Sequence, residues 1–521
     1  MSPMRLRVAF VLALCLFAPA GNVRAADDLS DKIAAIINAP EYKHARWGLL
    51  VVDAETGKTV YEHNPEMLFA PASVTKLYSC AAVLAALGAD HTFETPVHRR
   101  GEVVEGRLRG DLILVGSGDF TLGGRTTASG TMAFKDHDHI YASAAGLKTE
   151  LTDTDPLAGL KALAKQVKDA GVRQVDGDVL IDDRLFARSR GSGSGPDILT
   201  PIVVNDNVVD VVVTPAAKAG EPATAQTQPR TGFVQIDVQV DTVGTGKPTR
   251  IDVERVGPQR FAVRGQIALN VRPQVRICMV DDPAGFARAL FIDALRDEGV
   301  AVRASGLRPP TAELPEKESY AKLPRVAAYK SPPLSEAVKV TLKVSHNLYA
   351  SMMPLLLAVK HGKRTLPEGM RLEGEELGKL GVGVGEISLE SGAGGGNGDR
   401  VTPRATVQLL QAMAKRPDWP AYKAALPVLG VDGTLADVLP ADSSARGKVF
   451  GKTGTYGDPD LLNQRTQLRA KSLAGVMTTA SGRPLVVAIF VNDVSLPRGV
   501  DPAREGRQIG RLCEIIYQNA K

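Results

Sequence analysis

A long β-rich segment divides this chain of 521 residues into two outer stretches that mix helix and strand patterns. The first stretch ends near Phe93 and the second begins near Ala321. Between them, short apolar runs alternate with turns rich in Gly and Asp, a pattern typical of β-structure. We therefore predict a discontinuous α/β domain of residues 26–95 and 322–521, interrupted by an inserted β-rich region, residues 96–321, which holds one or two domains, the inner one at about 190–275.

Hydrophobic periodicity locates the individual elements. In the outer stretches it predicts helices at Leu29–Asn38, Pro332–Leu357, Pro403–Ala414 and Ala503–Gln518, and strands at Trp47–Val52, Thr59–His63, Lys448–Thr455, Gln467–Thr478 and Leu485–Asn492. In the middle it predicts strands at Asp111–Val115, Gln174–Ile181, Val203–Thr214, Val234–Val240 and Ile251–Val256, and helices at Leu157–Ala170 and Pro283–Glu298. The segment Lys218–Thr231, rich in Ala, Pro, Gln and Thr, is expected to be a mobile loop.

The first 25 residues have the composition of an export signal. Arg5 and Arg7 precede an apolar run from Val8 to Ala18, and small residues at the −3 and −1 positions allow cleavage after Ala25. That run is short for a membrane span, and no later stretch reaches the roughly 18–20 apolar residues that a span needs. We expect a periplasmic protein, with at most a peripheral association with membrane or cell wall.

Charge and cysteine content narrow the class further. Loss of the three arginines of the signal lowers the formal net charge from +5 to +2, which is not the charge pattern of a nucleic-acid-binding protein. Three cysteines remain, so they cannot all pair within the chain. Cys80 lies on an apolar helical face and is expected in the core. A disulfide between Cys278 and Cys513 is left open.

Ser73 and Lys76 form the first pattern with chemical meaning. Ser73 opens an apolar run with helical spacing, and Lys76 is one turn further on, so both side chains share a face. A helix N-terminus presents unpaired N–H groups that can stabilise an oxyanion. A serine there, with an amine beside it, is a candidate activated nucleophile. Alone, S-x-x-K is more often a helix cap beside a solvated charge.

Two further patterns change that interpretation. Ser345-His346-Asn347 lies inside the predicted helix Pro332–Leu357, and Lys452-Thr453-Gly454-Thr455 lies on a predicted strand. Either alone is usually unremarkable. The three together, in this order, resemble the signature of the penicillin-recognising serine acyl-transferases. The long interval before Ser345, which leaves room for an inserted domain, narrows the resemblance to the class C low-molecular-mass penicillin-binding proteins, the D-Ala-D-Ala carboxypeptidases/endopeptidases.

Other phrases similar to those of the family extend the resemblance over nearly all of the mature chain. They are Gly110-Asp111-Leu112 with Gly118-Asp119-Phe120, Val204-Asn205-Asp206-Asn207, and Leu426-Pro427 with Gly430 to Leu435. The resemblance implies a penicillin-binding transpeptidase-like fold of class α/β (α+β), with an antiparallel sheet, helices on both of its faces and a helical lobe.

The resemblance also implies the role of each motif residue. Ser73 is the expected nucleophile, and Lys76 can act as base only if burial and a nearby cation, Lys452, lower its pKa. Ser345 can relay a proton to the leaving nitrogen, and whether Lys76 or Ser345 takes the first proton is left open. Asn347 can hold Lys76 and a substrate amide. Together with Lys452, the hydroxyls of Thr453 and Thr455 suit a terminal carboxylate. The strand through Gly454 can pair with a substrate backbone. The N–H groups of Ser73 and Thr455 form the expected oxyanion hole.

Three features depart from the family pattern. His346 stands where the family usually has Asp, at a position whose side chain is generally not the one doing chemistry. The stretch Ser391 to Gly394 replaces an Asp-Gly-Ser-Gly phrase, and the segment Gly457–Arg469 is longer than the family's tight turn and is expected to border the site.

We therefore expect a serine DD-peptidase of peptidoglycan that is acylated by β-lactams, cuts D-Ala-D-Ala termini, D-Ala–meso-diaminopimelate cross-links or both, and needs no cofactor. Two alternatives stay open, a β-lactamase on the same scaffold and a peptidoglycan-binding protein without turnover. Against a β-lactamase, the sequence has no E-x-x-L-N phrase between the second and third motifs. Against a binding protein without turnover, all three motifs are intact. Asp136-His137-Asp138-His139 has metal-type side chains, but we interpret it as a solvated polar loop and expect no metal.

Overall fold

The computed structural model of the chain describes residues 23–142 and 148–520. The predicted export signal lies outside these residues except at its last three positions, where α1 (Val23–Ile37) begins. Among the described residues, no helix combines the length and the apolar content that crossing a bilayer requires.

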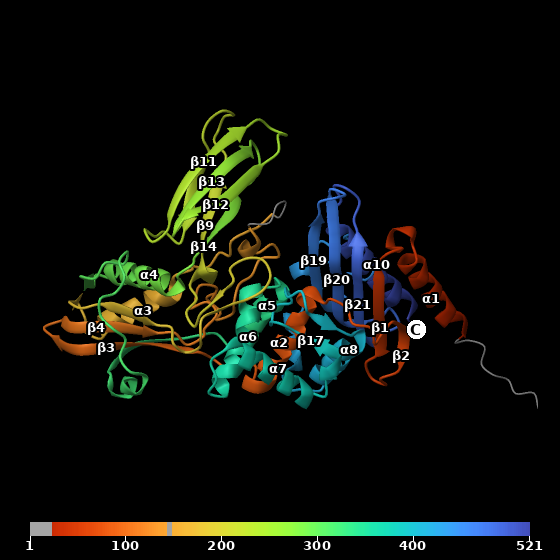
Figure 1. Cartoon of the computed structure of the whole chain (residues 1–521), viewed down its shortest axis with the longest axis horizontal. Helices are drawn as coiled ribbons and strands as arrows, with labels where there is room; N and C mark the ends of the chain where they lie inside the picture. Colours follow the sequence, from red (N-terminus) through yellow and green to blue (C-terminus); the bar gives the residue numbers. More distant parts are fainter. Residues whose placement is uncertain (1–22, 143–147, 521) are drawn as a thin grey trace, which may run out of the picture.

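A five-stranded antiparallel sheet joins the two ends of the chain (Figure 1). Its order is β19-β20-β21-β1-β2. The strands are β1 (Arg46–Asp53), β2 (Thr59–His63), β19 (Val449–Asp460), β20 (Arg465–Thr478) and β21 (Pro484–Ser495). All five contain strands predicted from the sequence, and β19 extends beyond its prediction by five residues, to Asp460.

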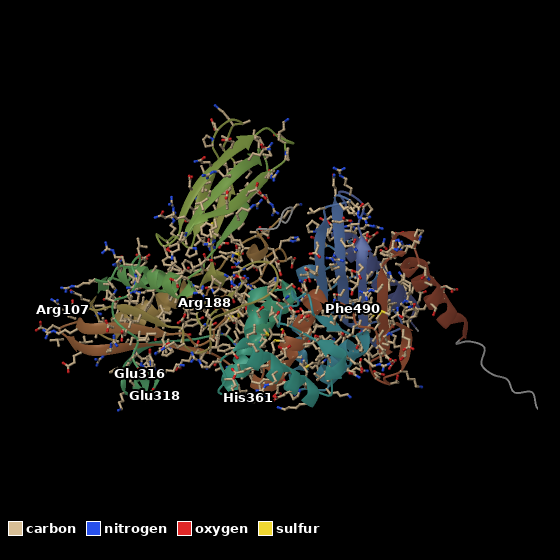
Figure 2. The ribbon with its side chains drawn as sticks, viewed as in Figure 1. Arg107, Arg188, Glu316, Glu318, His361 and Phe490 are labelled. Atoms are coloured by element: carbon tan, nitrogen blue, oxygen red, sulfur yellow. The ribbon has the colours of Figure 1, made fainter. Side chains whose placement is uncertain are left out.

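Each face of this sheet packs against its own hydrophobic core, because successive side chains on a strand point to opposite faces. On β1, Leu49 and Val51 enter the core under α1 and α10 (Ala503–Asn519), whereas Leu50 and Val52 enter the core under α2 (Thr75–Leu87) and α8 (Pro403–Ala414). Figure 2 labels Phe490 on β21, which belongs to the second core and stacks on Phe69 with ring centroids 5.9 Å apart.

A helical lobe completes this part of the molecule. It contains α2, α5 (Leu334–Lys343), α6 (Asn347–Lys360), α7 (Leu366–Lys379) and α9 (Trp419–Ala425). The prediction of one helix over Pro332–Leu357 is wrong, because the chain breaks between α5 and α6 at Val344-Ser345-His346. Apolar periodicity continues across the break and so conceals it. An antiparallel sheet with helices on both faces and a helical lobe confirms the predicted α+β fold class.

Among the described residues, the inserted part is built from three larger sheets and one short two-stranded pair. The largest has the order β15-β5-β4-β3-β16 with β6 beside β4, and α3 (Ala158–Asp169) and α4 (Pro283–Asp297) pack on it. Its strands are β3 (Glu94–Val104), β4 (Arg107–Val115), β5 (Gln174–Val175), β6 (Val179–Asp182), β15 (Ala301–Val302) and β16 (Arg325–Lys330). Since β16 pairs with β3, this sheet starts two residues before the predicted insertion and ends nine residues beyond it, and the predicted boundaries stay a proposal.

Two three-stranded sheets form the outer portion of the insertion. One has the order β10-β9-β14, and the other, β11-β13-β12, projects from the body in Figure 1. Their strands are β9 (Val208–Thr214), β10 (Thr224–Gln228), β14 (Gln274–Met279), β11 (Gln235–Val243), β12 (Arg250–Gly257) and β13 (Arg260–Ala268). Short two-stranded pairs join β7 (Ser189–Arg190) to β8 (Ile198–Leu199) and β17 (Ile387–Ser388) to β18 (Arg400–Val401).

One expectation about the insertion is wrong, and the open question about the cysteines is answered. Lys218–Thr231 is not a loop throughout, because Thr224–Gln228 forms β10 on the edge of β9. This strand is largely exposed and has no apolar alternation, so only its backbone pairing identifies it. The disulfide left open between Cys278 and Cys513 does not form, since both thiols are free and buried, as is Cys80.

Candidate active site

Ser73 and Lys76 meet at the start of α2. Ser73 lies in a short 3₁₀ turn, Ala72–Val74, and Lys76 is the second residue of the α-helix that follows. The Lys76 Nζ atom lies 2.9 Å from the Ser73 Oγ atom. Ser73 is half-buried, whereas Lys76 is fully buried. This arrangement gives a serine hydroxyl an adjacent amine that is shielded from water.

The surroundings of Lys76 suit an amine that accepts a proton. Its Nζ atom donates hydrogen bonds to Asn347 Oδ1 and to the backbone oxygen of Ala393, both at 2.7 Å. These two atoms only accept, so a neutral amine with two N–H groups keeps its lone pair for the Ser73 hydroxyl. Burial lowers the pKa of Lys76 to about 7, so a substantial fraction of the amine is neutral near pH 7.

The second motif lies in the break between α5 and α6. Ser345 adopts a left-handed backbone conformation with φ of 64°, which a helix does not tolerate. His346 begins the next helix as its N-cap, and Asn347 is the first residue of α6. The break directs the Ser345 hydroxyl to Lys452 and the Asn347 amide to Lys76.

The third motif occupies the inner end of β19. The Lys452 Nζ atom donates to Ser345 Oγ at 2.9 Å and to the Thr453 backbone oxygen at 2.6 Å. Lys452 is fully buried, and its pKa is lowered strongly by burial and then by the charge of Lys76. Burial is the main cause of the lowered pKa of Lys76, as expected, and the repulsion between the two amines acts at Lys452.

Gly454 is required by a close approach between β19 and the 3₁₀ turn that contains Ser73. A Cβ atom at this position would lie 2.3 Å from the Pro71 backbone oxygen and 3.0 Å from the Ser73 nitrogen. Any side chain would therefore push the strand away from Ser73. The glycine of the third motif thus has a steric reason, which the sequence pattern alone did not reveal.

A cleft of about 700 Å³ opens over these groups and is lined by Ser73, Ser345, Asn347, Thr453 and Thr455. At one end the Thr453 hydroxyl donates to Thr434 Oγ1, and Lys471 Nζ donates to the Thr455 hydroxyl oxygen, both at 2.7 Å. Lys471 lies opposite Thr455 on β20, and burial lowers its pKa to about 8. The cleft therefore presents hydroxyls and amines together at this end, a combination suited to a carboxylate.

The segment Gly457–Arg469 borders this cleft, as expected from the sequence, but mostly as extended strand. β19 continues to Asp460 and β20 starts at Arg465, so only residues 461–464 form the turn. Gly457, Thr466 and Leu468 line the cleft. This hairpin, rather than an irregular loop, forms one wall of the site.

Several residues that contact the site carried little signal in the sequence. The glycine-rich stretch Gly191–Gly195 lies against the second motif, where the Ser194 backbone oxygen accepts from Asn347 Nδ2 at 2.9 Å. Ala393 supplies the backbone oxygen that Lys76 contacts, and Lys471 and Thr434 extend the third motif. Backbone acceptors have no residue-type signature, so only a local excess of glycine hinted at a close approach.

The polar loop at Asp136–His139 differs from its predicted solvated state. Asp138 and His139 are buried, with 1% and 5% of their surfaces exposed. Arg125 donates to both Asp138 oxygens, at 2.7 and 2.8 Å. His137 keeps the expected exposure and lies 3.1 Å from Asp437. The buried pair was missed because its partners come from distant parts of the chain.

Comparisons with known proteins agree with this architecture. A D-alanyl-D-alanine carboxypeptidase of Actinomadura sp. is 31% identical over 465 residues, which cover 84% of this chain and 78% of that protein. The D-alanyl-D-alanine carboxypeptidase DacB of Haemophilus influenzae is 23% identical over 464 residues, covering 86% and 85%. The crystal structure of penicillin binding protein 4 (dacB) from the same organism shares the fold, with a TM-score of 0.67 at 21% identity over 95% of this chain and 99% of that one.

The family match covers most of the chain. Residues 29–509 match the D-Ala-D-Ala carboxypeptidase 3 (S13) family. That range includes most of both outer stretches and the whole insertion. Together with the 31% identity to a carboxypeptidase over most of both chains, this match shows that the chain belongs to the D-Ala-D-Ala carboxypeptidase 3 (S13) family.

Proposed function

We propose that the protein is a serine-type DD-peptidase of peptidoglycan that works through an acyl-enzyme on Ser73 and is acylated by β-lactams. The observation that carries this proposal is the contact of the Ser73 hydroxyl, 2.9 Å away, with a buried lysine whose pKa is about 7. Membership of the D-Ala-D-Ala carboxypeptidase family supports the reaction class, and the contact between Ser73 and Lys76 supports serine as the nucleophile.

In the proposed acylation step, the Lys76 lone pair takes the Ser73 proton while Ser73 Oγ attacks the carbonyl carbon of the penultimate D-Ala. Lys76 is favoured as first acceptor because it directly contacts Ser73 Oγ. The N–H groups of Ser73 and Thr455 hold the oxyanion. As the C–N bond breaks, the proton held by Lys76 passes through the Ser345 hydroxyl to the leaving amine, so Lys76 becomes neutral again and Ser345 regains its proton. Lys452, bonded to Ser345, supports that transfer. Water then hydrolyses the ester and frees Ser73.

Substrate binding in this proposal uses the second and the third motif. Asn347 holds a substrate amide, and an extended stem peptide pairs with β19 beside Gly454. The carboxylate of the leaving residue lies against Lys452, Lys471 and the hydroxyls of Thr453 and Thr455. A terminal D-Ala and the D-centre of a cross-linked meso-diaminopimelate both carry this carboxylate next to the scissile nitrogen, so both reactions are included.

Labelling with fluorescent penicillin tests the nucleophile. The wild type should be labelled with one molecule per chain, Ser73→Ala should not be labelled, and Ser481→Ala, a change at an exposed serine, should behave like the wild type. Equal labelling of Ser73→Ala would refute the proposal. Mass analysis after incubation with a monomeric pentapeptide and with a cross-linked dimer distinguishes carboxypeptidase from endopeptidase activity.

The two alternative functions have their own readouts. Rapid nitrocefin turnover would indicate a β-lactamase, which needs a base for deacylation. Glu373, between the second and third motifs, does not offer one, because burial and the nearby Asp399 raise its pKa to about 8 and keep it protonated near pH 7. Binding of muropeptides without release of D-Ala would indicate a protein without turnover.

We further propose that the protein is exported to the periplasm and that residues 1–25 are removed. Its substrate, cross-linked peptidoglycan, lies in that compartment. N-terminal sequencing of protein recovered from a periplasmic extract should begin at Ala26, and an N-terminus at Met1 would contradict this.

A further inference from the structure

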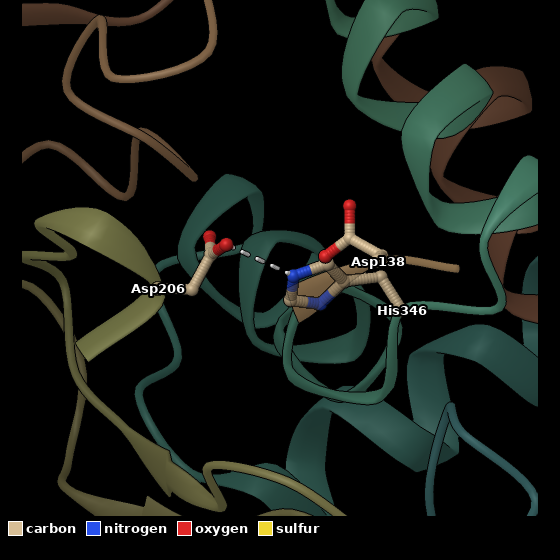
Figure 3. A group of neighbouring side chains, drawn as sticks. All are labelled: Asp138, Asp206 and His346. Atoms are coloured by element: carbon tan, nitrogen blue, oxygen red, sulfur yellow. Dashed lines mark ion pairs between the residues drawn. The ribbon is translucent and has the colours of Figure 1, made fainter. Parts of the chain in front are cut away.

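The inserted region contacts all three residues of the second motif. The Tyr141 hydroxyl donates to the Ser345 backbone oxygen, and Ser194 accepts from Asn347. Between these, the His346 Nε2 atom lies 3.5 Å from Asp206 Oδ2 (Figure 3). The second motif is therefore held by residues about 140 to 204 positions earlier in the chain as well as by its own helix.

His346 is oriented by its own helix so that one ring nitrogen faces Asp206. Its Nδ1 atom accepts from the Tyr349 backbone N–H at 3.4 Å, which leaves the proton on Nε2. The ring stacks on the Tyr349 ring, with centroids 3.6 Å apart and planes 12° from parallel. Burial lowers the pKa of His346, so the ring is neutral. His346 thus turns an uncharged N–H group toward the Asp206 carboxylate, at a distance of 3.5 Å that is longer than a hydrogen bond.

Asp206 is fixed from several sides. Its Oδ2 atom accepts from Arg125 at 2.6 Å and from His139 at 2.8 Å, and its Oδ1 atom accepts from the Tyr349 hydroxyl. It lies in a run of three left-handed residues, Asn205, Asp206 and Asn207, with φ between 46° and 58°. Such a run is strained for side chains other than glycine, so the surrounding contacts must hold it.

Most of the charge in this cluster is already paired within it. Burial would lower the pKa of His139, but Asp210 and Asp206 outweigh it and raise the value to about 10, so His139 is a cation. Arg125 and His139 therefore face three carboxylates, those of Asp138, Asp206 and Asp210. Asp206 keeps its negative charge, since Arg125 and its other partners overcome burial and hold its pKa well below the usual range.

A metal ion does not fit this cluster. Ligand atoms of Asp138, Asp206 and His346 lie within 4.8 Å of one another, which by spacing alone allows an ion. However, the guanidinium of Arg125 already binds both carboxylates, at 2.6 to 2.8 Å. A divalent cation there would be adjacent to a fixed positive charge, so the cluster is better described as an ion-pair network.

We propose that Asp206 of the inserted region is a positioning residue for the second motif: its carboxylate disfavours a negative side chain at position 346, and its contact with the neutral His346 ring helps to hold Ser345 and Asn347 against the two lysines. This inference rests on the proposed function. It also gives a reason for His346 where the family usually has Asp, because an Asp at that position would place a further carboxylate against Asp206.

The matched variants His346→Asn and His346→Asp test this pairing. Both side chains can cap α6 by accepting the Tyr349 N–H, but only Asp adds a negative charge. We expect His346→Asn to keep the rate of penicillin acylation within about tenfold of the wild type. His346→Asp should be at least about 100-fold slower than His346→Asn, with the loss in kcat rather than KM, because the carboxylate-binding residues are untouched.

A double-mutant cycle with Asp206→Asn makes the test independent of folding losses. Asp206→Asn alone should slow the wild type, yet it should speed His346→Asp, so that the preference between His and Asp at position 346 shrinks or reverses. Melting temperatures are recorded for every variant, and if His346→Asp does not fold, the Asp206→Asn background decides the preference. Equal acylation rates for His346→Asn and His346→Asp would overturn the inference. It would also be overturned if Asp206→Asn changed the acylation rate by the same factor whichever residue occupies position 346. A wild type that penicillin does not label would instead overturn the proposed function.

Discussion

Two clusters of buried charged groups contact the second motif, and they differ in their charge balance. Lys76 and Lys452 contact Asn347 and Ser345, and in the described part of the chain they donate only to neutral oxygen atoms. Arg125 and His139, beside His346, are each bound to carboxylates. Burial without a partner lowers a lysine pKa, whereas burial with carboxylate partners preserves charge. The first cluster is thereby suited to proton transfer and the second to holding structure.

The largest expected effect is on catalysis, in the cluster of Lys76 and Lys452, whose amines have no carboxylate partner among the described residues. Lys76→Met should slow penicillin acylation by about 10³–10⁴-fold or more, because it removes the proposed base. Its melting temperature should be equal to or above that of the wild type, since an apolar side chain replaces a buried amine without an ion pair. Stopped-flow acylation and thermal unfolding measure the two effects. A Lys76→Met enzyme that is slow because it is unfolded would contradict the comparison.

The same lysine predicts the pH dependence of the wild type. The pKa of Lys76 is lowered to about 7, so the amine gains a proton and loses its lone pair below that pH. The acylation rate should therefore fall about tenfold for each pH unit below 7 and level off above it. A rate that is flat from pH 5 to pH 8 would rule out Lys76 as the base.

Changes in the cluster of Arg125, His139 and their carboxylate partners should lower the stability of the protein. Arg125→Met leaves Asp138 and Asp206 buried without their main cation and should lower the free energy of unfolding by about 3–5 kcal/mol. Arg107→Met is the matched control, because Arg107 pairs with Asp176 at the outer end of the inserted sheet (Figure 2) and its side chain is 49% exposed. That control should lose less than about 1 kcal/mol. Equal losses in a urea titration would mean that the Arg125 cluster is not a stabilising network.

The smallest effect is expected at the rim of the cleft. Lys471→Gln should raise KM about tenfold for a peptide that ends in the D-Ala carboxylate, because one cation near that group is lost. KM for the same peptide as a carboxamide should hardly change. Lys165→Gln, at an exposed lysine on α3, serves as the control. A loss of the same size on both peptides would place the role of Lys471 in structure rather than in carboxylate recognition.

The sequence pattern predicted secondary structure correctly where an element buries one regular face. The hairpin near Thr59, the helix at Pro403–Ala414 and the three C-terminal strands follow their predicted periodicity, since each buries a regular face. The helix break at Ser345 was missed because apolar spacing continues through it. The burial of Asp138 and His139 was missed because it depends on Arg125, Asp206 and Asp210.

The sequence by itself determined the three motifs, their order, the α+β class and the presence of a long insertion, because these depend on residue identity and short-range periodicity. Only the tertiary structure decided that Ser345 leaves the helix, that Lys76 is buried enough to lose its proton near pH 7, and that the insertion contacts the second motif. These properties depend on contacts between groups far apart in the chain. Such contacts determine how far each side chain is exposed to water and which charges lie beside it, and a local sequence pattern holds no information about them.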